Sequence, residues 1–304
     1  MGKSKGMRRL FVGLLMITLS LLSERAVEKA MAKTNRSFDE YKERLSEIGT
    51  DGLDYKDYLA QHDTIIRPDE GYVIDAEDYV RIEDMEIKEY QNLEGMEGTA
   101  VYTGEKGLIE YEVTVEEEGF YDISLLYYPI EGKSASIQRG IFVDGELPYD
   151  QLSLVEFSRI WVDEVSEWER DNRGNDLRPK QMEAPEWILS YCYDSEGYET
   201  DRLSIYLTPG THTLTLYSRR EPMLLRKIIL KNVEDVGDYQ TVKQIHDAQG
   251  ATDTSDRMIT IHAEHANRKS SQMLYPSQDK SSPAVYPYSA KNLKNNTIGS
   301  NSSW

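Results

Sequence analysis

Cysteine is almost absent from the sequence. Cys192 is the only one in 304 residues, so the chain can form no internal disulfide. It lies in the segment ILSYCYDS with no histidine nearby to activate it, which favours a small buried apolar residue over a catalytic thiol. The core of this protein must therefore come from apolar packing rather than from a disulfide scaffold.

A basic stripe is also missing. The chain holds 35 Lys and Arg against 54 Asp and Glu, which gives a net charge of -19. Binding to nucleic acid depends on clustered Lys and Arg that neutralise phosphates, and the body of the chain has no such cluster. We therefore expect no nucleic-acid partner.

Familiar catalytic motifs are lacking as well. His262 and His265 are three positions apart with Glu264 beside the second, so they do not match the HExxH zinc helix. There is no GxSxG turn, no phosphate-binding loop and no dinucleotide fingerprint. The sequence alone cannot place two carboxylates at the separation that glycoside hydrolysis needs. We expect a protein that is not an enzyme.

Long apolar runs are limited to one, LFVGLLMITLSLL at residues 10–22, which follows four basic residues. This pattern is typical of an export signal, and the run is shorter than the roughly 20 residues of a comfortable membrane span. Ala30-Met31-Ala32 offers a cleavage site, so residues 1–32 are interpreted as a signal peptide or an uncleaved signal anchor. No cysteine follows the run to carry a lipid. We expect an extracellular, cell-membrane-associated protein.

Helical patterns follow the signal. Ser37 and Glu40 form a capping box, and apolar residues recur at helical spacing from Phe38 to Ile48. DYKDYLAQHD predicts a second short helix that ends before Pro68. Residues 33–69 are therefore predicted to be a helical spacer.

From residue 70 to residue 235 the apolar residues alternate with polar ones. The period of two recurs in LIEYEVTV, FYDISLLYY and LSIYLTPGTHTLTLYS, and the turns VDGE and TPGT separate strand-like runs. About eight such strands in roughly 160 residues suit a jelly roll better than an immunoglobulin domain. The predicted fold class is mainly β, an antiparallel β-sandwich.

Particular stretches of this region resemble known modules. VIDAEDYV, IEYEVTVEEEGFYDISLLYYP and LLRKIIL resemble a galactose-binding-like sandwich of the carbohydrate-binding-module kind. FSRIWVDE, ERDNRGNDLRPKQMEAPEW and SRREPM resemble more specifically the N-terminal module of large bacterial extracellular solute-binding proteins of sugar ABC transporters. The resemblance runs from about Tyr55 to Leu230. It implies a galactose-binding-like jelly roll, an oligosaccharide or polysaccharide ligand, and an ABC permease as a partner.

The stretch ERDNRGNDLRPK at 169–180 places seven charged side chains around Gly174. Because strand-like WILSYCYD follows it, we interpret it as an ordered loop between strands. Its carboxylates, amides and guanidiniums suit paired hydrogen bonds to sugar hydroxyls, or a salt-bridge network that only holds the loop in place. Nearby aromatic residues offer a stacking face. The candidate ligand-binding residues are Tyr128, Arg139, Trp161, Asp171, Asn172, Arg173, Asn175, Asp176, Arg178 and Trp187.

A structural calcium site is conceivable at Glu77, because sandwich carbohydrate modules often hold the ion with a first-strand Glu and a last-strand Asp. Here the last-strand position is Arg226, which would repel a cation. We therefore predict no metal or other cofactor, and we expect Arg226 to pair with Glu77 or Asp78.

The segment 260–270, TIHAEHANRKS, repeats the register of VIDAEDYVRIE at 73–83. It resembles the first strand of another sandwich, yet no second set of strands follows before Trp304. We expect residues 236–304 to be a linker and the start of a second β-module, largely disordered, as in a truncated gene product. Two functions stay open: a carbohydrate-binding module of a sugar transporter, and a non-catalytic structural or interaction domain of a cell-envelope protein.

Overall fold

The computed structural model describes most of the chain outside its termini. The expected signal or anchor at 1–32 and the histidines at 262 and 265 lie outside the described residues. No helix in the described part of the chain is long and apolar enough to cross a membrane. The described residues are 36–46, 52–62, 64–165, 169–173, 177, 179–233, 237–252, 266–277 and 297–300.

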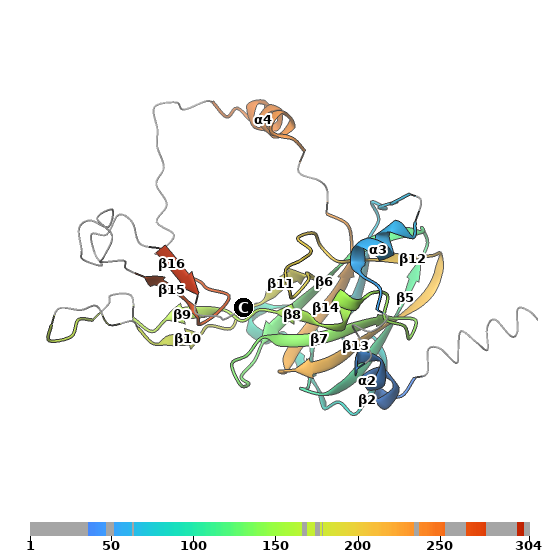
Figure 1. Ribbon diagram of the computed structural model, residues 1–304, viewed down its shortest axis with the longest axis horizontal. Helices are drawn as coiled ribbons and strands as arrows, with labels where there is room; N and C mark the ends of the chain where they lie inside the picture. The colour runs from blue at the N-terminus through green and yellow to red at the C-terminus, as the bar shows by residue number, and fades with distance from the viewer. Residues whose placement is uncertain are drawn as a thin grey trace, which may run out of the picture.

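Two antiparallel sheets form the body of the molecule (Figure 1). The larger sheet has seven strands in the order β11-β6-β14-β4-β3, with β1 also paired to β14 and β12 to β6. Its strands are β1 (Tyr72–Asp75), β3 (Ile87–Gln91), β4 (Thr99–Thr103), β6 (Gly119–Pro129), β11 (Ile188–Tyr191), β12 (Ser204–Leu207) and β14 (Met223–Leu230).

The smaller sheet has five strands in the order β2-β5-β13-β7-β8. Together the two sheets confirm the fold class predicted from the alternating pattern. The five strands are β2 (Tyr79–Glu83), β5 (Gly107–Val115), β7 (Ile137–Val143), β8 (Val155–Phe157) and β13 (Gly210–Arg220).

The main core lies between these sheets, because alternate residues of the long strands turn inward. Tyr111 and Val113 of β5 pack with Leu125 and Tyr127 of β6 in one buried cluster. Cys192 is fully buried in the same cluster, and burial raises the pKa of its thiol. The sequence-based interpretation of this cysteine as a packing residue is confirmed.

The turn VDGE closes as a two-residue hairpin, as its sequence predicts. Val143 and Glu146 exchange two backbone hydrogen bonds of 2.9 Å. Asp144 and Gly145 between them have φ angles of 50° and 75°, the left-handed region that this tight turn requires.

Helix α2 (Phe38–Ser46) is packed on the outer face of the five-stranded sheet. Its predicted capping box is confirmed, with the Ser37 N–H 2.6 Å from Oε2 of Glu40. The Phe38 ring stacks on Tyr217 at 4.9 Å with 6° between the planes. Tyr41 is fully buried, and burial raises its pKa to about 12, so its hydroxyl keeps the proton that it donates to Glu110. Part of the predicted spacer is thus packed on the sandwich.

The second predicted helix is confirmed as α3 (Tyr55–Ala60), with Asp54 as its N-cap. The region around the sandwich also holds short 3-10 turns and a hairpin arm. These elements are η1 (Leu93–Gly95), η2 (Asp150–Ser153), β9 (Trp161–Asp163) and β10 (Gln181–Glu183).

The arm formed by β9 and β10 extends away from the sandwich in Figure 1. Downstream of the sandwich the structure describes α4 (Tyr239–Ala248) and a ladder of β15 (Leu274–Ser277) with β16 (Thr297–Ser300). The ladder lies beside the arm in the same view. The segment 260–265, which holds most of the expected first strand of a second module, lies outside the described residues.

Candidate functional site

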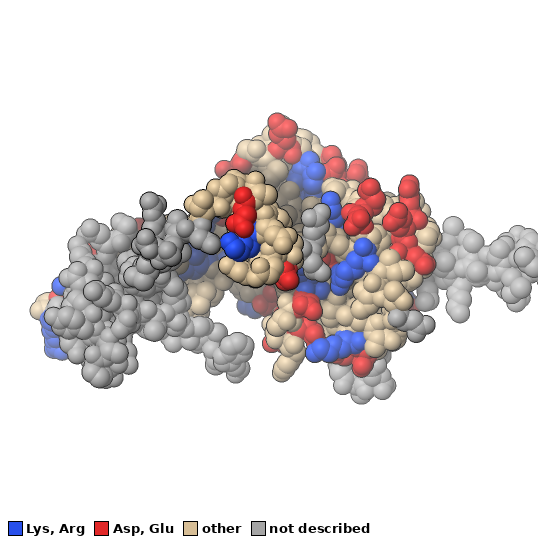
Figure 2. Space-filling model, turned by 90° about the horizontal axis from the view of Figure 1, so that it is seen from above, with Lys and Arg blue, Asp and Glu red and all other residues tan. Residues whose placement is uncertain are grey.

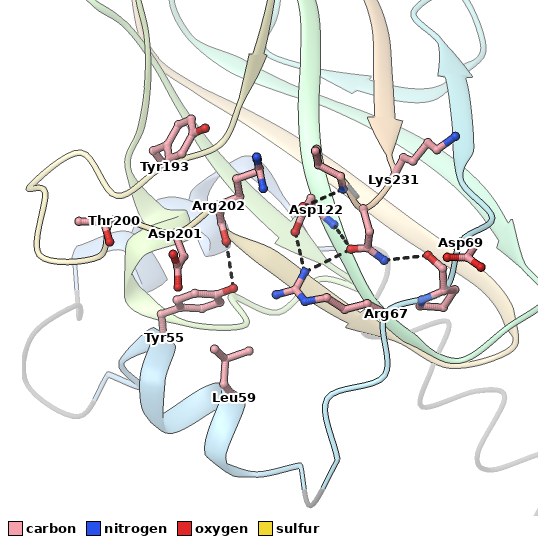
Figure 3. A pocket seen from close by; sticks show the side chains of 13 residues that line it. Tyr55, Leu59, Arg67, Asp69, Asp122, Tyr193, Thr200, Asp201, Arg202 and Lys231 are labelled. Carbon is pink, nitrogen blue, oxygen red and sulfur yellow. Dashed lines mark hydrogen bonds and ion pairs between the residues drawn. The ribbon is translucent and has the colours of Figure 1, made fainter. Parts of the chain in front are cut away.

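A polar cleft of about 570 Å³ opens at one end of the sandwich. Four elements contribute to it: helix α3, the segment before β1, the start of β6, and the loop between β11 and β12 (Figure 3). Residues just after β14 close the remaining side. The chemistry of the cleft depends on Arg67, Asp122, Tyr193, Asp201, Arg202 and Asn232.

Asp122 is the buried acidic group of the cleft, with 3% of the residue exposed. Its Oδ1 accepts hydrogen bonds of 2.8 Å from Nη1 of Arg67 and from Oγ of Ser204. Asn232 holds the same arginine through its Oδ1 at 3.2 Å and donates through Nδ2 to the Phe120 carbonyl at 2.8 Å. A buried carboxylate requires such partners, and these contacts fix both Asp122 and Arg67 at the cleft wall.

Arg202 contributes an unused donor. Its guanidinium lies over the Tyr191 ring at 5.2 Å, and its Nε is buried with no hydrogen-bond partner in the described part of the chain. The backbone at this position is fixed, because the Tyr55 hydroxyl donates to the Arg202 carbonyl and lies 3.1 Å from Oγ of Ser204. Tyr193 presents a ring that is 44% exposed. The cleft therefore combines fixed donors and acceptors with an accessible aromatic face.

The structure brings two of the sequence-predicted residues together. Tyr128 and Trp187 are ring neighbours at 5.3 Å, and the Trp187 indole N–H donates to the Leu93 carbonyl at 3.1 Å. Burial raises the pKa of Tyr128. Both rings are half-buried on the outer side of the seven-stranded sheet, opposite the core residue Tyr127. η1 contacts this pair through the Leu93 carbonyl.

The charged loop lies between β9 and β10 in the chain, and the structure describes its residues 169–173, 177, 179 and 180. Asp171 accepts a hydrogen bond of 2.8 Å from the Arg173 backbone N–H, a local turn contact that does not involve a ligand. Asn172 and Arg173 are exposed. Trp161 at the base of the arm is only 5% exposed. The predicted residues Asn175, Asp176 and Arg178 lie outside the described residues.

Arg139 is placed in the interior, with 1% of the residue exposed. Its Nη1 donates to the carbonyls of Gln138, Arg220 and Glu221 at 2.9 to 3.1 Å, and its Nη2 donates to Thr103. These contacts join β7 to the turn between β13 and β14. The structure therefore gives Arg139 the position of an internal anchor, away from any ligand that approaches from solvent.

The predicted partner of Arg226 was wrong. Arg226 pairs with Asp75, with Nη1 and Oδ1 2.5 Å apart, and donates through Nε to the Glu97 carbonyl. Asp75 of β1 lies opposite Lys227, the neighbour of Arg226 on β14, and Arg226 reaches Asp75 instead of the exposed Glu77 and Asp78. In the described part of the chain, no group of three His, Cys, Asp or Glu residues is placed to hold a metal ion.

Sequence reasoning missed the cleft. Asp122 had a visible signal, since a lone acid within the apolar strand FYDISLLYY needs a fixed cation or donor once it is buried. Arg67 and Arg202 gave no comparable signal, because 55 and 80 residues separate them from Asp122 and only the fold brings them near.

No protein-family model matches the chain, and no curated protein matches it. Solved structures with similar folds include two carbohydrate-binding modules. The C-terminal CBM6 of a laminarinase from Zobellia galactanivorans is 14% identical, with a TM-score of 0.32, and the match covers 54% of this chain and all of the module. A family 35 module from Clostridium thermocellum is also 14% identical, with a TM-score of 0.30, over 54% of this chain and 99% of that module.

A larger protein also matches: a cycloisomaltooligosaccharide glucanotransferase from Paenibacillus sp., 19% identical with a TM-score of 0.31. The match covers 54% of this chain and only 19% of that enzyme. At such identities and scores the matches assign no residue of this chain to a binding site. The sandwich is established by its own two sheets, and the function must be argued from the cleft.

Proposed function

We propose that this protein is an extracytoplasmic carbohydrate-binding module, and that the cleft between α3 and the start of β6 holds the sugar. The observation that carries the proposal is the buried Nε of Arg202, which has no hydrogen-bond partner among the described residues, in a cleft where Asp122 and Asn232 already hold Arg67. A buried donor without a partner costs about 1 to 3 kcal/mol. A sugar hydroxyl supplies the missing acceptor once the Arg202 side chain turns its Nε toward the cleft, which makes ligand binding favourable at this position.

The remaining groups of the cleft suit the same ligand. Arg67 is oriented by Asp122 and Asn232, and 41% of its side chain is exposed, so its remaining N–H groups face the cleft opening. Asp201 and Lys231 line the rim with opposite charges. Figure 2 shows acidic and basic side chains interspersed over one face of the molecule. Such mixed polarity suits a polyhydroxylated ligand better than a strongly charged one.

The cellular setting is a further part of this proposal. We infer that the module is exported, stays at the outer face of the cell membrane, and works with the permease of a sugar ABC transporter. Support comes from the basic and apolar start of the chain and from the resemblance of the segments FSRIWVDE and SRREPM to solute-binding proteins of that kind. The protein binds its sugar without cleaving it under this proposal.

An oligosaccharide array with the full chain tests the proposal. We expect saturable binding to one group of related glycans, with no release of reducing ends on long incubation. Arg202→Ala should weaken that binding about ten- to a hundredfold with little change in stability, since one charged hydrogen bond is lost. Arg173→Ala on the arm is the matched control. If no glycan binds, the structural or interaction function is the correct one.

A further inference from the structure

The chain downstream of the sandwich returns to the arm and pairs with it. The Trp161 N–H donates to the Lys269 carbonyl at 2.8 Å, and the Lys269 N–H donates back to the Trp161 carbonyl at 3.0 Å. This reciprocal exchange is the narrow hydrogen-bonded pair of an antiparallel ladder. On its other side β9 pairs with β10, where Trp161 lies opposite Glu183. Lys269 thus occupies the edge of the arm that β10 leaves open.

Side chains fix the register of this contact. Lys269 is only 8% exposed, and its ammonium lies 2.5 Å from Oδ1 of Asp163 and 3.1 Å from Oε1 of Gln181. Gln181 also donates to the same Oδ1 of Asp163, so one strand of the arm orients the other. A buried ammonium is strongly unfavourable without such partners, and a shift of the segment by one residue would remove all of them.

A second ion pair extends the contact along the chain. Arg268 lies 2.7 Å from Glu186, which follows β10 on the way to β11. The β15–β16 ladder begins five residues after Lys269, at Leu274, and lies next to the arm in Figure 1. The contact at Lys269 is therefore placed to set the position of the β-structure that follows it.

We propose that the arm is a docking edge that accepts the downstream β-segment of this same chain as an added strand. Trp161 forms the backbone hydrogen bonds to that segment, and Asp163 and Gln181 bind the Lys269 ammonium. An open strand edge tends to pair with extended segments of other molecules, which leads to aggregation. A partner segment within the same chain occupies the edge and prevents such pairing. The arm then serves to hold the following β-structure at a fixed place beside the sandwich. This role is independent of sugar binding in the cleft.

Amide hydrogen exchange in the full chain tests the docking. The Trp161 and Lys269 amides should be protected from exchange in the native protein. Asp163→Asn or Lys269→Met should raise the exchange rates of both amides together, by about a hundredfold or more, because each substitution leaves a buried polar group without its charged partner. The amides of Leu214 and Leu216 in β13 should be unchanged. Lys180→Met, which alters an exposed lysine of the same arm, is the matched control and should have no effect.

Acylation of lysines tests independently whether Lys269 is buried in the native chain. An amine-reactive ester should label Lys180 readily and Lys269 slowly, at any protein concentration. Equal labelling of the two lysines would overturn the proposal, as would fast exchange at Trp161 in the unaltered protein. Protection of Lys269 that appears only as the protein concentration rises would show that the edge accepts a strand from a second copy, which also contradicts a docking partner within one chain.

Discussion

The guanidinium of Arg67 and the carboxylate of Asp122 meet at 2.8 Å across the end of the sandwich, and they join the segment before β1 to the start of β6. Asp122 is buried, whereas 41% of the Arg67 side chain is exposed. The pair therefore does two things at once. It neutralises an acid in the wall of the cleft, and it presents an oriented cation at the opening.

Removing the acid should destabilise the protein. Asp122→Ala removes the carboxylate that accepts from Arg67 and Ser204, while Asn232 still accepts from Arg67. We expect a loss of about 2 to 3 kcal/mol in the free energy of unfolding, below the range for fully buried pairs because Arg67 is partly solvated. Urea unfolding measures the change. Asp69→Ala, at the rim of the same cleft, should alter it by less than about 0.5 kcal/mol. Equal effects of the two variants would contradict the assigned role of Asp122.

Helix α2 should be a structural part of the sandwich. Tyr41→Ala removes a fully buried ring that packs on Phe142 at 4.7 Å, and the expected cost is about 3 kcal/mol or more. Thermal melts compare it with Tyr239→Ala in α4, whose ring is 73% exposed and whose loss should be nearly neutral. A melting temperature unchanged by Tyr41→Ala would mean that α2 does not pack on the sheet in solution.

His212 should make stability depend on pH. Its hydrogen bond to Asp144 raises the pKa of the imidazole, and its second ring nitrogen faces the Thr208 carbonyl. Because the folded-state pKa lies above the ordinary value of 6.5, the stabilisation is complete below that value and is lost as the pH rises through the folded pKa. For a partly exposed pair we expect no more than about 1 kcal/mol.

Urea unfolding of the native chain and of His212→Gln across this pH window measures the effect. The difference between the two should shrink as the pH rises. A difference that grows with pH would show that the histidine is neutral in the folded protein and would contradict the assignment.

Two of the predicted ligand arginines, Arg139 and Arg173, should differ in their effect on stability. Arg139→Ala removes a buried guanidinium that donates to three carbonyls and should cost about 3 kcal/mol or more in stability, whereas Arg173→Ala on the exposed arm should cost less than about 0.5 kcal/mol. Chemical denaturation measures both. A ligand-binding role for Arg173 would appear as weakened sugar binding at unchanged stability.

Much of the fold could be predicted from local patterns, and much of the site could not. The alternation in LIEYEVTV and FYDISLLYY predicts two central strands, because one face of each must reach the core. The capping box at Ser37 is equally local. The partner of Arg226, in contrast, depends on the pairing of β1 with β14, which places Asp75 opposite Lys227 and which no pattern in LLRKIIL reveals.

The loop at 169–180 shows the same limit. Its composition predicts polar contacts, but composition does not tell whether a hairpin folds back on its sandwich or extends from it. Asp163 and Gln181 at the base of the arm take Lys269 as their partner, 88 positions or more along the chain. Long-range pairing of this kind is decided by the tertiary fold, which charge patterning alone does not predict.

The most direct test of the carbohydrate cleft is a calorimetric titration of three proteins with the glycan that gives the strongest array signal. The native chain and Arg173→Ala should bind it with the same Kd. Arg202→Ala should bind about ten- to a hundredfold more weakly while its unfolding midpoint stays within the range of the other two. The opposite result, unchanged affinity for Arg202→Ala with weakened binding by Arg173→Ala, would contradict the cleft and place the sugar on the arm.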